Sequence, residues 1–157
     1  MNGGHRLAMY LIGKTYRIIL FVLAMSILLA GCIGRGDWDY DLVNGYKLIR
    51  SSAHTLRLCC DENLRDQWDN NTIVLKQYYV TMVTISDPFV GLQGIPTQDR
   101  SASDEELNTP AENYQYYLLD SVNHLLYGPC SKEAFYDKCE QEDATGLDNW
   151  VSTKNLK

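Results

Sequence analysis

This 157-residue chain contains five cysteines, whose thiols can take part in more kinds of chemistry than its other side chains: Cys32, Cys59, Cys60, Cys130 and Cys139. A thiol can be acylated, oxidised to a disulfide, bound to a metal ion or used as a nucleophile, and its surroundings select among these. Cys32 differs from the other four because it directly follows an apolar segment. The cysteines therefore raise two separate questions, one about the start of the chain and one about its body.

The apolar segment before Cys32 runs from Ile18 to Leu29 and reads IILFVLAMSILL. As a helix it would span about 18 Å, well short of the ~30 Å hydrocarbon core of a membrane. Lys14 and Arg17 precede it, and carrying these side chains into lipid would cost roughly 2.5 to 3.5 kcal/mol each. The segment is therefore typical of a signal peptide, with translation beginning at Met1 or at Met9.

The residues that end this segment, Leu29-Ala30-Gly31-Cys32, resemble the lipobox of bacterial lipoproteins. The resemblance implies cleavage between Gly31 and Cys32 and a diacylglyceryl thioether on the Cys32 sulfur. Two or more acyl chains, palmitate among them, hold a protein stably on a membrane, whereas a single chain does so only marginally. We therefore expect the mature protein to be held on a membrane by lipid.

The lipobox also divides the chain into parts. We expect residues 1–31 to be removed as a lipoprotein signal peptide, residues 32–36 to be a lipidated tether, and residues 37–157 to form one domain in the cell envelope. In a Gram-negative host, Ile33 after the cysteine resembles the pattern that is sorted to the outer membrane. The domain would then lie on the periplasmic side of that membrane.

Export opens an oxidising compartment, in which the other four cysteines could form two disulfides with three connectivities. Cys130 lies just before an expected helix and Cys139 lies along it, so their Cα atoms would be roughly 12 Å apart, beyond the ~7 Å that a disulfide allows. Pairing would then join Cys59 or Cys60 to Cys130 or Cys139. The alternative is that all four are small buried apolar residues.

Patterns for catalysis or metal binding are scarce. His54 and His124 stand in no nucleophile elbow, no CxxC or HxxxH spacing predicts zinc, and no glycine-rich loop predicts a phosphate site. Asp37, Asp39 and Asp41 suggest a calcium loop, but leucines at 42 and 48 occupy the positions that need Gly and Glu. We therefore predict no catalytic residue, no metal and no cofactor.

The body of the chain is acidic. After residue 31 it carries 11 Lys and Arg against all 20 Asp and Glu, a formal charge of −9. Such a field repels phosphate groups and anionic lipid. We therefore expect no nucleic-acid partner.

Alternating apolar patterns and β-branched content predict six strands. These are an edge strand or docked arm at Asp37–Leu42, strands at Tyr46–Ser52 and His54–Cys60 after the Asn44-Gly45 turn, a central strand at Tyr78–Ser86, and Tyr114–Asp120, which forms a hairpin with Leu125–Tyr127. Asp87-Pro88 and Gly94-Ile95-Pro96 interrupt the pattern.

The acidic segment Thr97–Asn113 predicts a long mobile loop, with a short helix near Asp104–Leu107, that is dispensable for folding. Ser131 is a helix cap, and Phe135 and Cys139 follow it at helical spacing. The predicted fold is therefore α+β: a small, mainly antiparallel sheet with one C-terminal helix packed on it.

The body resembles a family of small uncharacterised bacterial lipoproteins. The residues that carry the resemblance are Tyr40-Asp41-Leu42, Asn44-Gly45-Tyr46, Tyr116-Tyr117-Leu118, Asp120, Tyr127-Gly128-Pro129 and Phe135. The resemblance implies a shared fold and secretion route and supplies no activity.

We therefore expect a non-enzymatic envelope lipoprotein that binds another envelope protein or a cell-wall component. One alternative is an inhibitor or immunity protein against a basic secreted enzyme such as a lysozyme, because an acidic body attracts a cationic partner. Another is a cell-wall hydrolase or thiol enzyme. Nine tyrosines and three tryptophans in the body could form a stacking surface for glycan or peptide, or simply fill the core.

Overall fold

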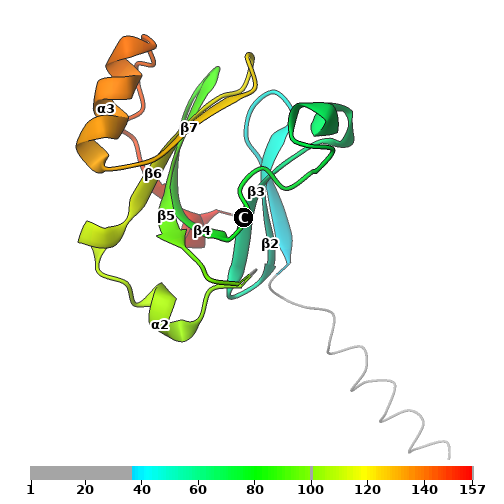
Figure 1. Cartoon of the computed structure of the whole chain (residues 1–157), viewed down its shortest axis with the longest axis vertical. Coiled ribbons are helices and arrows are strands. Elements are labelled where there is room, and N and C mark those ends of the chain that lie inside the picture. Colours follow the sequence, from blue (N-terminus) through cyan, green and yellow to red (C-terminus); the bar gives the residue numbers. More distant parts are fainter. Residues whose placement is uncertain (1–36, 100, 157) are drawn as a thin grey trace, which may run out of the picture. The chain divides into compact units, whose positions relative to one another are not determined.

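The computed structural model describes residues 37–99 and 101–156, which form two antiparallel sheets (Figure 1). The first sheet has the order β1-β2-β3, with β1 at Trp38–Asp41, β2 at Tyr46–Ser52 and β3 at Thr55–Cys60. The second has the order β7-β6-β5-β4-β8, with β4 at Tyr78–Ser86, β5 at Phe89–Pro96, β6 at Gln115–Asp120, β7 at Leu125–Cys130 and β8 at Val151–Ser152. The predicted α+β class is confirmed, but the strands form two sheets where one was expected.

Helices are few and short. They are α2 at Asp104–Leu107, α3 at Lys132–Gln141 and the 3-10 helices η1 at Glu62–Gln67, η2 at Ala111–Asn113 and η3 at Thr153–Asn155. Ser131 caps α3 by accepting a hydrogen bond from the Ala134 N–H. No helix within the described ranges is long and apolar enough to cross a membrane. The predicted signal peptide and the tether with Cys32 lie outside the described residues.

The main core lies between the two sheets. Leu48, Leu56 and Leu58 of the first sheet pack there with Val80 and Leu92 of the second, all nearly inaccessible to solvent. Their positions follow from the alternation of side chains along each strand. The core therefore accounts for the apolar face that each sheet must bury.

A second cluster covers the opposite face of the five-stranded sheet. In β6, Leu119 belongs to the main core, whereas its neighbour Leu118 joins Phe135 and Cys139 of α3. Figure 1 shows α3 on the side of β6 away from β2 and β3. The five-stranded sheet is thus enclosed on both faces, which the prediction of a single sheet did not foresee.

The sequence pattern missed β5, the central strand of the larger sheet. A Cβ on Gly94 would lie 2.1 Å from the Tyr79 carbonyl oxygen, and one on Gly91 would lie 2.6 Å from Thr84 Cγ2. Glycine inside a strand marks such close approaches. β4, which we predicted to be central, instead lies between β5 and the two-residue β8.

The predicted edge strand, hairpin and both helices are confirmed as β1, β6–β7, α2 and α3. The acidic segment that carries α2 is anchored more firmly than its composition indicates. The buried Ala102 donates its N–H to the His54 carbonyl at 2.8 Å, and its own carbonyl lies 3.0 Å from His54 Nδ1. Ser101 Oγ lies 2.9 Å from Thr55 Oγ1. We therefore expect this segment to contribute to stability.

Candidate functional site

The four body cysteines are free thiols in the structure. Cys60 lies in the main core, whereas Cys139 and Cys130 belong to the cluster on the other face of the larger sheet. Of the two alternatives left open by the sequence, a disulfide between Cys59 or Cys60 and Cys130 or Cys139 is not formed among the described residues. The five-stranded sheet lies between Cys60 on one face and Cys130 and Cys139 on the other.

The surroundings of these thiols keep them protonated. Burial raises the pKa of Cys59 and of Cys139 to about 11, and it also raises the pKa of Cys60 and Cys130. Because the thiolate is the nucleophilic form, a reactive cysteine needs a lowered pKa. None of the four has the environment of an activated thiol.

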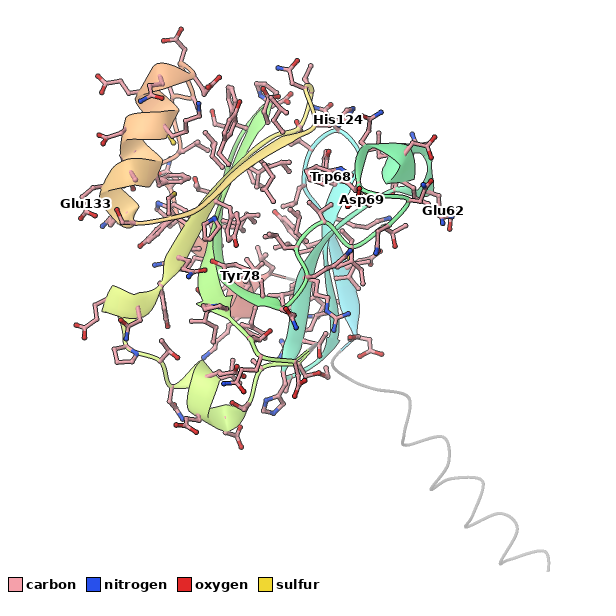
Figure 2. The ribbon with its side chains drawn as sticks, viewed as in Figure 1. Glu62, Trp68, Asp69, Tyr78, His124 and Glu133 are labelled. Atoms are coloured by element: carbon pink, nitrogen blue, oxygen red, sulfur yellow. The ribbon has the colours of Figure 1, made fainter. Side chains whose placement is uncertain are left out.

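His124 takes part in a polar cluster that fastens the two sheets together. The Tyr46 hydroxyl lies 2.9 Å from His124 Nδ1 and accepts a hydrogen bond from Trp68 Nε1 at 3.1 Å. Figure 2 shows Trp68 and His124 close together at this end of the molecule. Asn44 Nδ2 donates to Ser121 Oγ at 2.8 Å. Several residues of the family resemblance therefore serve as inter-sheet contacts.

His124 does not activate Ser121 as a nucleophile, because the Ser121 hydroxyl donates to the Pro88 carbonyl rather than to His124. His54, the other histidine of the body, is bound to the Ala102 carbonyl. Within residues 37–99 and 101–156, no group of three His, Cys, Asp or Glu side chains is arranged to hold a metal ion. The two histidines are thus placed as structural groups.

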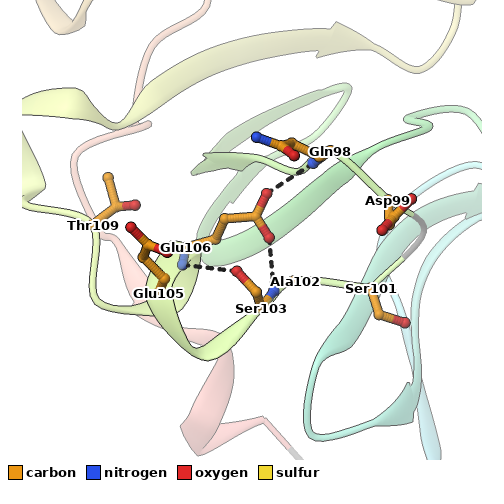
Figure 3. Close-up of a pocket in the computed structure, with 8 residues that line it drawn as sticks. All are labelled: Gln98, Asp99, Ser101, Ala102, Ser103, Glu105, Glu106 and Thr109. Atoms are coloured by element: carbon orange, nitrogen blue, oxygen red, sulfur yellow. Dashed lines mark hydrogen bonds between the residues drawn. The ribbon is translucent and has the colours of Figure 1, made fainter.

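A pocket of about 430 Å³ lies in the segment around α2 (Figure 3). We call it the acidic pocket, because Asp99, Glu105 and Glu106 are the charged residues among the described ones that line it, together with Gln98, Ser101, Ala102, Ser103 and Thr109. The Glu106 carboxylate accepts hydrogen bonds from the Ser103 N–H at 2.7 Å and the Gln98 N–H at 2.8 Å. These bonds hold the Glu106 pKa below its usual range. Glu106 thus stabilises the segment around α2. The carboxylates of Asp99 and Glu105 remain for contact with a ligand.

A second pocket, of about 460 Å³, opens between the two sheets. We call it the inter-sheet groove; its lining residues are Arg50, Ala53, Tyr79, Thr81, Met82, Leu107, Tyr114, Ser152, Thr153 and Lys154. They come from β2, β4, α2 and the C-terminal segment. In the part of the chain that the structure describes, two cations and no carboxylate line the groove, although the domain as a whole is acidic.

Hydrogen bonds fix the walls of the inter-sheet groove. The Tyr79 hydroxyl donates to the Ala53 carbonyl at 3.2 Å. Thr153 Oγ1 lies 3.1 Å from the Val80 carbonyl oxygen and 3.0 Å from that of Thr81, which holds the C-terminal segment against β4. The groove is therefore preformed, as ligand sites usually are.

The two cations of the groove have no carboxylate partner. Arg50 Nε donates to the Ser52 carbonyl at 3.2 Å. The ion pairs of the described part of the chain are Lys47–Asp61, His54–Asp104 and Lys138–Glu142, and none includes Arg50 or Lys154. Positive charge is thus available to a ligand in the groove.

Sequence reasoning did not find the groove, because its residues lie in distant parts of the chain. One signal was present: Arg50 has the same strand parity as the buried Tyr46 and Leu48. A cation on the apolar face of a strand marks the place where that face stops being core. Lys154 and Tyr79 carry no comparable signal.

Comparison with known proteins identifies a family. A family model described as a protein of unknown function, DUF3997, matches residues 43–145. No curated protein and no solved structure matches the chain. The matched range includes both sheets except β1 and β8, and it includes α2 and α3. This chain therefore belongs to the DUF3997 family.

Proposed function

We propose that this protein is a lipid-anchored envelope lipoprotein, cut between Gly31 and Cys32, whose domain is a non-enzymatic binding module. The apolar segment and the sequence Leu29-Ala30-Gly31-Cys32 support the anchor. Residues 1–36 lie outside the described residues, so this part of the proposal rests on sequence. The protein would act at a membrane surface of the cell envelope.

Replacing the acylated cysteine tests the anchor. The Cys32→Ser variant should stay uncleaved and take up no radioactive palmitate in cells. Cys130→Ser is the matched control and should be cleaved and labelled like the unaltered chain. Normal labelling of Cys32→Ser would refute the anchor.

The unpaired cations of the inter-sheet groove are the observation that carries the binding role. Apolar and aromatic walls from Tyr79, Met82 and Leu107 surround a space in which Arg50 and Lys154 meet no carboxylate. Arg50 is partly exposed and Lys154 is exposed, and cations so placed bind carboxylates through charge-assisted hydrogen bonds. We therefore propose that the groove receives a peptide chain with free carboxylates, from an envelope protein or from the cell wall.

This role can be tested by comparing two sets of short peptides. One set has free carboxylates, and the other has the same sequences amidated at every carboxylate. The amidated set should bind at least tenfold more weakly in calorimetry. Arg50→Met and Lys154→Met should each weaken binding of the free acids by roughly three- to fivefold, as about 1 kcal/mol per partly exposed ion pair implies. Lys76→Met, which alters an exposed lysine outside the groove, should change nothing. Equal binding by both peptide sets would refute the proposal.

The acidic pocket supports a second candidate, inhibition of a basic secreted enzyme. Asp99 and Glu105 face a solvent-open pocket that none of the described cations lines. If this pocket binds lysozyme, Asp99→Asn with Glu105→Gln should lower the association rate at low salt in surface plasmon resonance. Lysozyme that associates equally fast with both proteins would remove this candidate.

The raised pKa values of the thiols favour a binding module over a thiol enzyme. A thiol titration of the folded protein near pH 7 should find no fast-reacting cysteine. One body thiol reacting much faster than a free thiol would revive the thiol-enzyme alternative.

A further inference from the structure

A smaller hollow adjoins the inter-sheet groove. Its volume is about 220 Å³, and Met82, Gln93, Tyr116, Lys132 and Trp150 line it. We call it the Trp150 hollow. Met82 of β4 lines both spaces.

Gln93 gives the hollow an unused acceptor. The side chain is 9% exposed, and its Nε2 donates to the Tyr116 hydroxyl at 2.8 Å. Its Oε1 is buried and has no hydrogen-bond partner among the described residues. Leaving a buried acceptor unpaired costs about 1–3 kcal/mol. A ligand N–H or O–H that donates to Oε1 would recover this free energy on binding.

Trp150 gives the hollow an apolar wall. Its Nε1 already donates to the Tyr136 hydroxyl at 3.1 Å, so the indole offers ring surface rather than its N–H. Tyr116 packs against it edge to face, with ring centroids 5.8 Å apart, and Phe135 lies 5.5 Å away. The ring is therefore held in place, ready to stack on the C–H face of a ligand.

Lys132 gives the hollow a donor. It is the exposed first residue of α3, and none of the ion pairs among the described residues includes it. An ammonium group donates and never accepts. A ligand that fits must therefore present an acceptor toward Lys132 and a donor toward Gln93.

We propose that the Trp150 hollow binds one N-acetylated amino-sugar unit of a glycan. The amide N–H of the acetamido group donates to Gln93 Oε1, its carbonyl oxygen accepts from Lys132, and the pyranose C–H face stacks on Trp150. The volume is below the ~300 Å³ of sites for larger drug-sized ligands and suits a single ring. This proposal rests on the proposed binding function and names one class of ligand for it.

The hollow and the groove are separate sites. The Tyr116 and Trp150 walls of the hollow belong to the cluster on the α3 face of the five-stranded sheet, whereas the groove opens between the two sheets. The sugar proposal for the hollow therefore stands apart from the carboxylate proposal for the groove.

The sugar site can be tested by titrating the purified lipidated protein, in detergent, with the N-acetylglucosamine trisaccharide. We expect the indole N–H signal of Trp150, assigned with Trp150→Phe, to shift with a dissociation constant of about 0.1 to 1 mM. Lys132→Met should weaken binding at least threefold, and Gln93→Leu at least tenfold, while Lys76→Met should bind like the unaltered chain. The deacetylated trisaccharide should not bind, because it lacks the carbonyl and its ammonium groups repel Lys132.

Three results would overturn the sugar proposal: no Trp150 shift up to about 10 mM trisaccharide, equal binding of the acetylated and deacetylated sugars, or acidic peptides shifting Trp150 while the sugar does not. If Gln93→Leu does not fold, Lys132→Met and the deacetylated sugar still decide. Sugar binding without peptide binding would refute the carboxylate groove alone, and peptide binding in the groove without sugar binding would refute the Trp150 hollow alone.

Discussion

The acidic pocket and the inter-sheet groove share one four-residue helix and have opposite charge. Glu105 and Glu106 of α2 line the acidic pocket, whereas the next residue, Leu107, lines the groove. Among the described residues, the acidic pocket is lined by carboxylates and no cation, and the groove is lined by Arg50 and Lys154 and no carboxylate. The overall charge of the domain therefore does not indicate the charge of each pocket.

The two pockets also differ in how their charges are used. In the acidic pocket, the Glu106 carboxylate accepts hydrogen bonds from two backbone N–H groups of its own segment and so stabilises that segment. Neither cation of the groove is consumed in an ion pair within the described residues. Glu106 therefore has a structural role, whereas the groove keeps two cations beside an apolar wall that a ligand could use.

The largest expected effect comes from the close approach of β5 to β4, the strand that carries Tyr79 of the groove. Gly94→Ala would place a Cβ 2.1 Å from the Tyr79 carbonyl oxygen, so β5 must move away from β4. We expect the free energy of unfolding in denaturant to fall by about 3 kcal/mol. Ser51→Ala, at an exposed site of β2, is the control and should change it by less than ~0.5 kcal/mol. A stable Gly94→Ala protein would mean that the strands are not this close.

Replacing residues 98–108 by a short Gly/Ser linker removes the acidic pocket and one wall of the groove together. Composition predicted little effect on stability, but the buried Ala102 and its two hydrogen bonds to His54 would be lost. We expect the thermal midpoint to fall by about 8 °C, which corresponds to about 2 kcal/mol. An unchanged midpoint would restore the prediction of a dispensable loop.

Asp120 ends β6 next to Ser121 of the polar cluster, accepts hydrogen bonds within its own turn, and lines neither pocket. Burial alone would raise the pKa of Asp120, but hydrogen bonds from Asn123 and Val122, with His124 nearby, hold it below the ordinary 3.8. Its stabilisation is therefore present above that pH and is lost as the pH falls through the lower folded value. Asp120→Asn should lower stability by about 1 kcal/mol at pH 6 and flatten the loss of stability between about pH 4 and pH 2, measured by urea unfolding.

At neutral pH, Asp120→Asn should bind the carboxylate peptide in the groove as tightly as the unaltered chain does. This result would show that Asp120 affects stability and not the groove. An equally steep acid limb in Asp120→Asn and the unaltered chain would show that other carboxylates control acid unfolding.

The smallest expected effect is the influence of one pocket on the other. Asp99→Asn with Glu105→Gln should strengthen binding of a carboxylate peptide in the groove by less than about twofold at low salt, because exposed charges act weakly at a distance. The difference should vanish near 0.5 M salt, where the Debye length is roughly 4 Å. A loss of peptide affinity would mean that the acidic pocket itself forms part of the peptide site.

Local patterns predicted the parts of this fold that local physics controls. The alternation in β1, the turn at Asn44 and the cap at Ser131 act within a few residues, and each was found where expected. β5 escaped because Gly91 and Gly94 look like strand breakers until the side chains that need their space are known. The pairing of strands into two sheets depends on contacts between residues distant in sequence.

The candidate site was predictable only in part, for the same reason. The lipobox is a contiguous motif and could be proposed from sequence, whereas the groove combines Arg50 with Lys154, which lie more than a hundred positions apart. The aromatic residues indicated a stacking surface or a core without distinguishing the two. Trp150 is the tryptophan that lines the hollow, while Trp38 and Trp68 pack against the main core.

The most direct test of the central claim is to locate a bound carboxylate peptide on the protein. In a titration of the isotope-labelled lipidated protein, followed by amide chemical shifts, we expect the largest shifts at Arg50, Tyr79 and residues 152–154. Residues 98–106 should remain unshifted. Shifts concentrated at residues 98–106, with none near Arg50 and Lys154, would contradict the account.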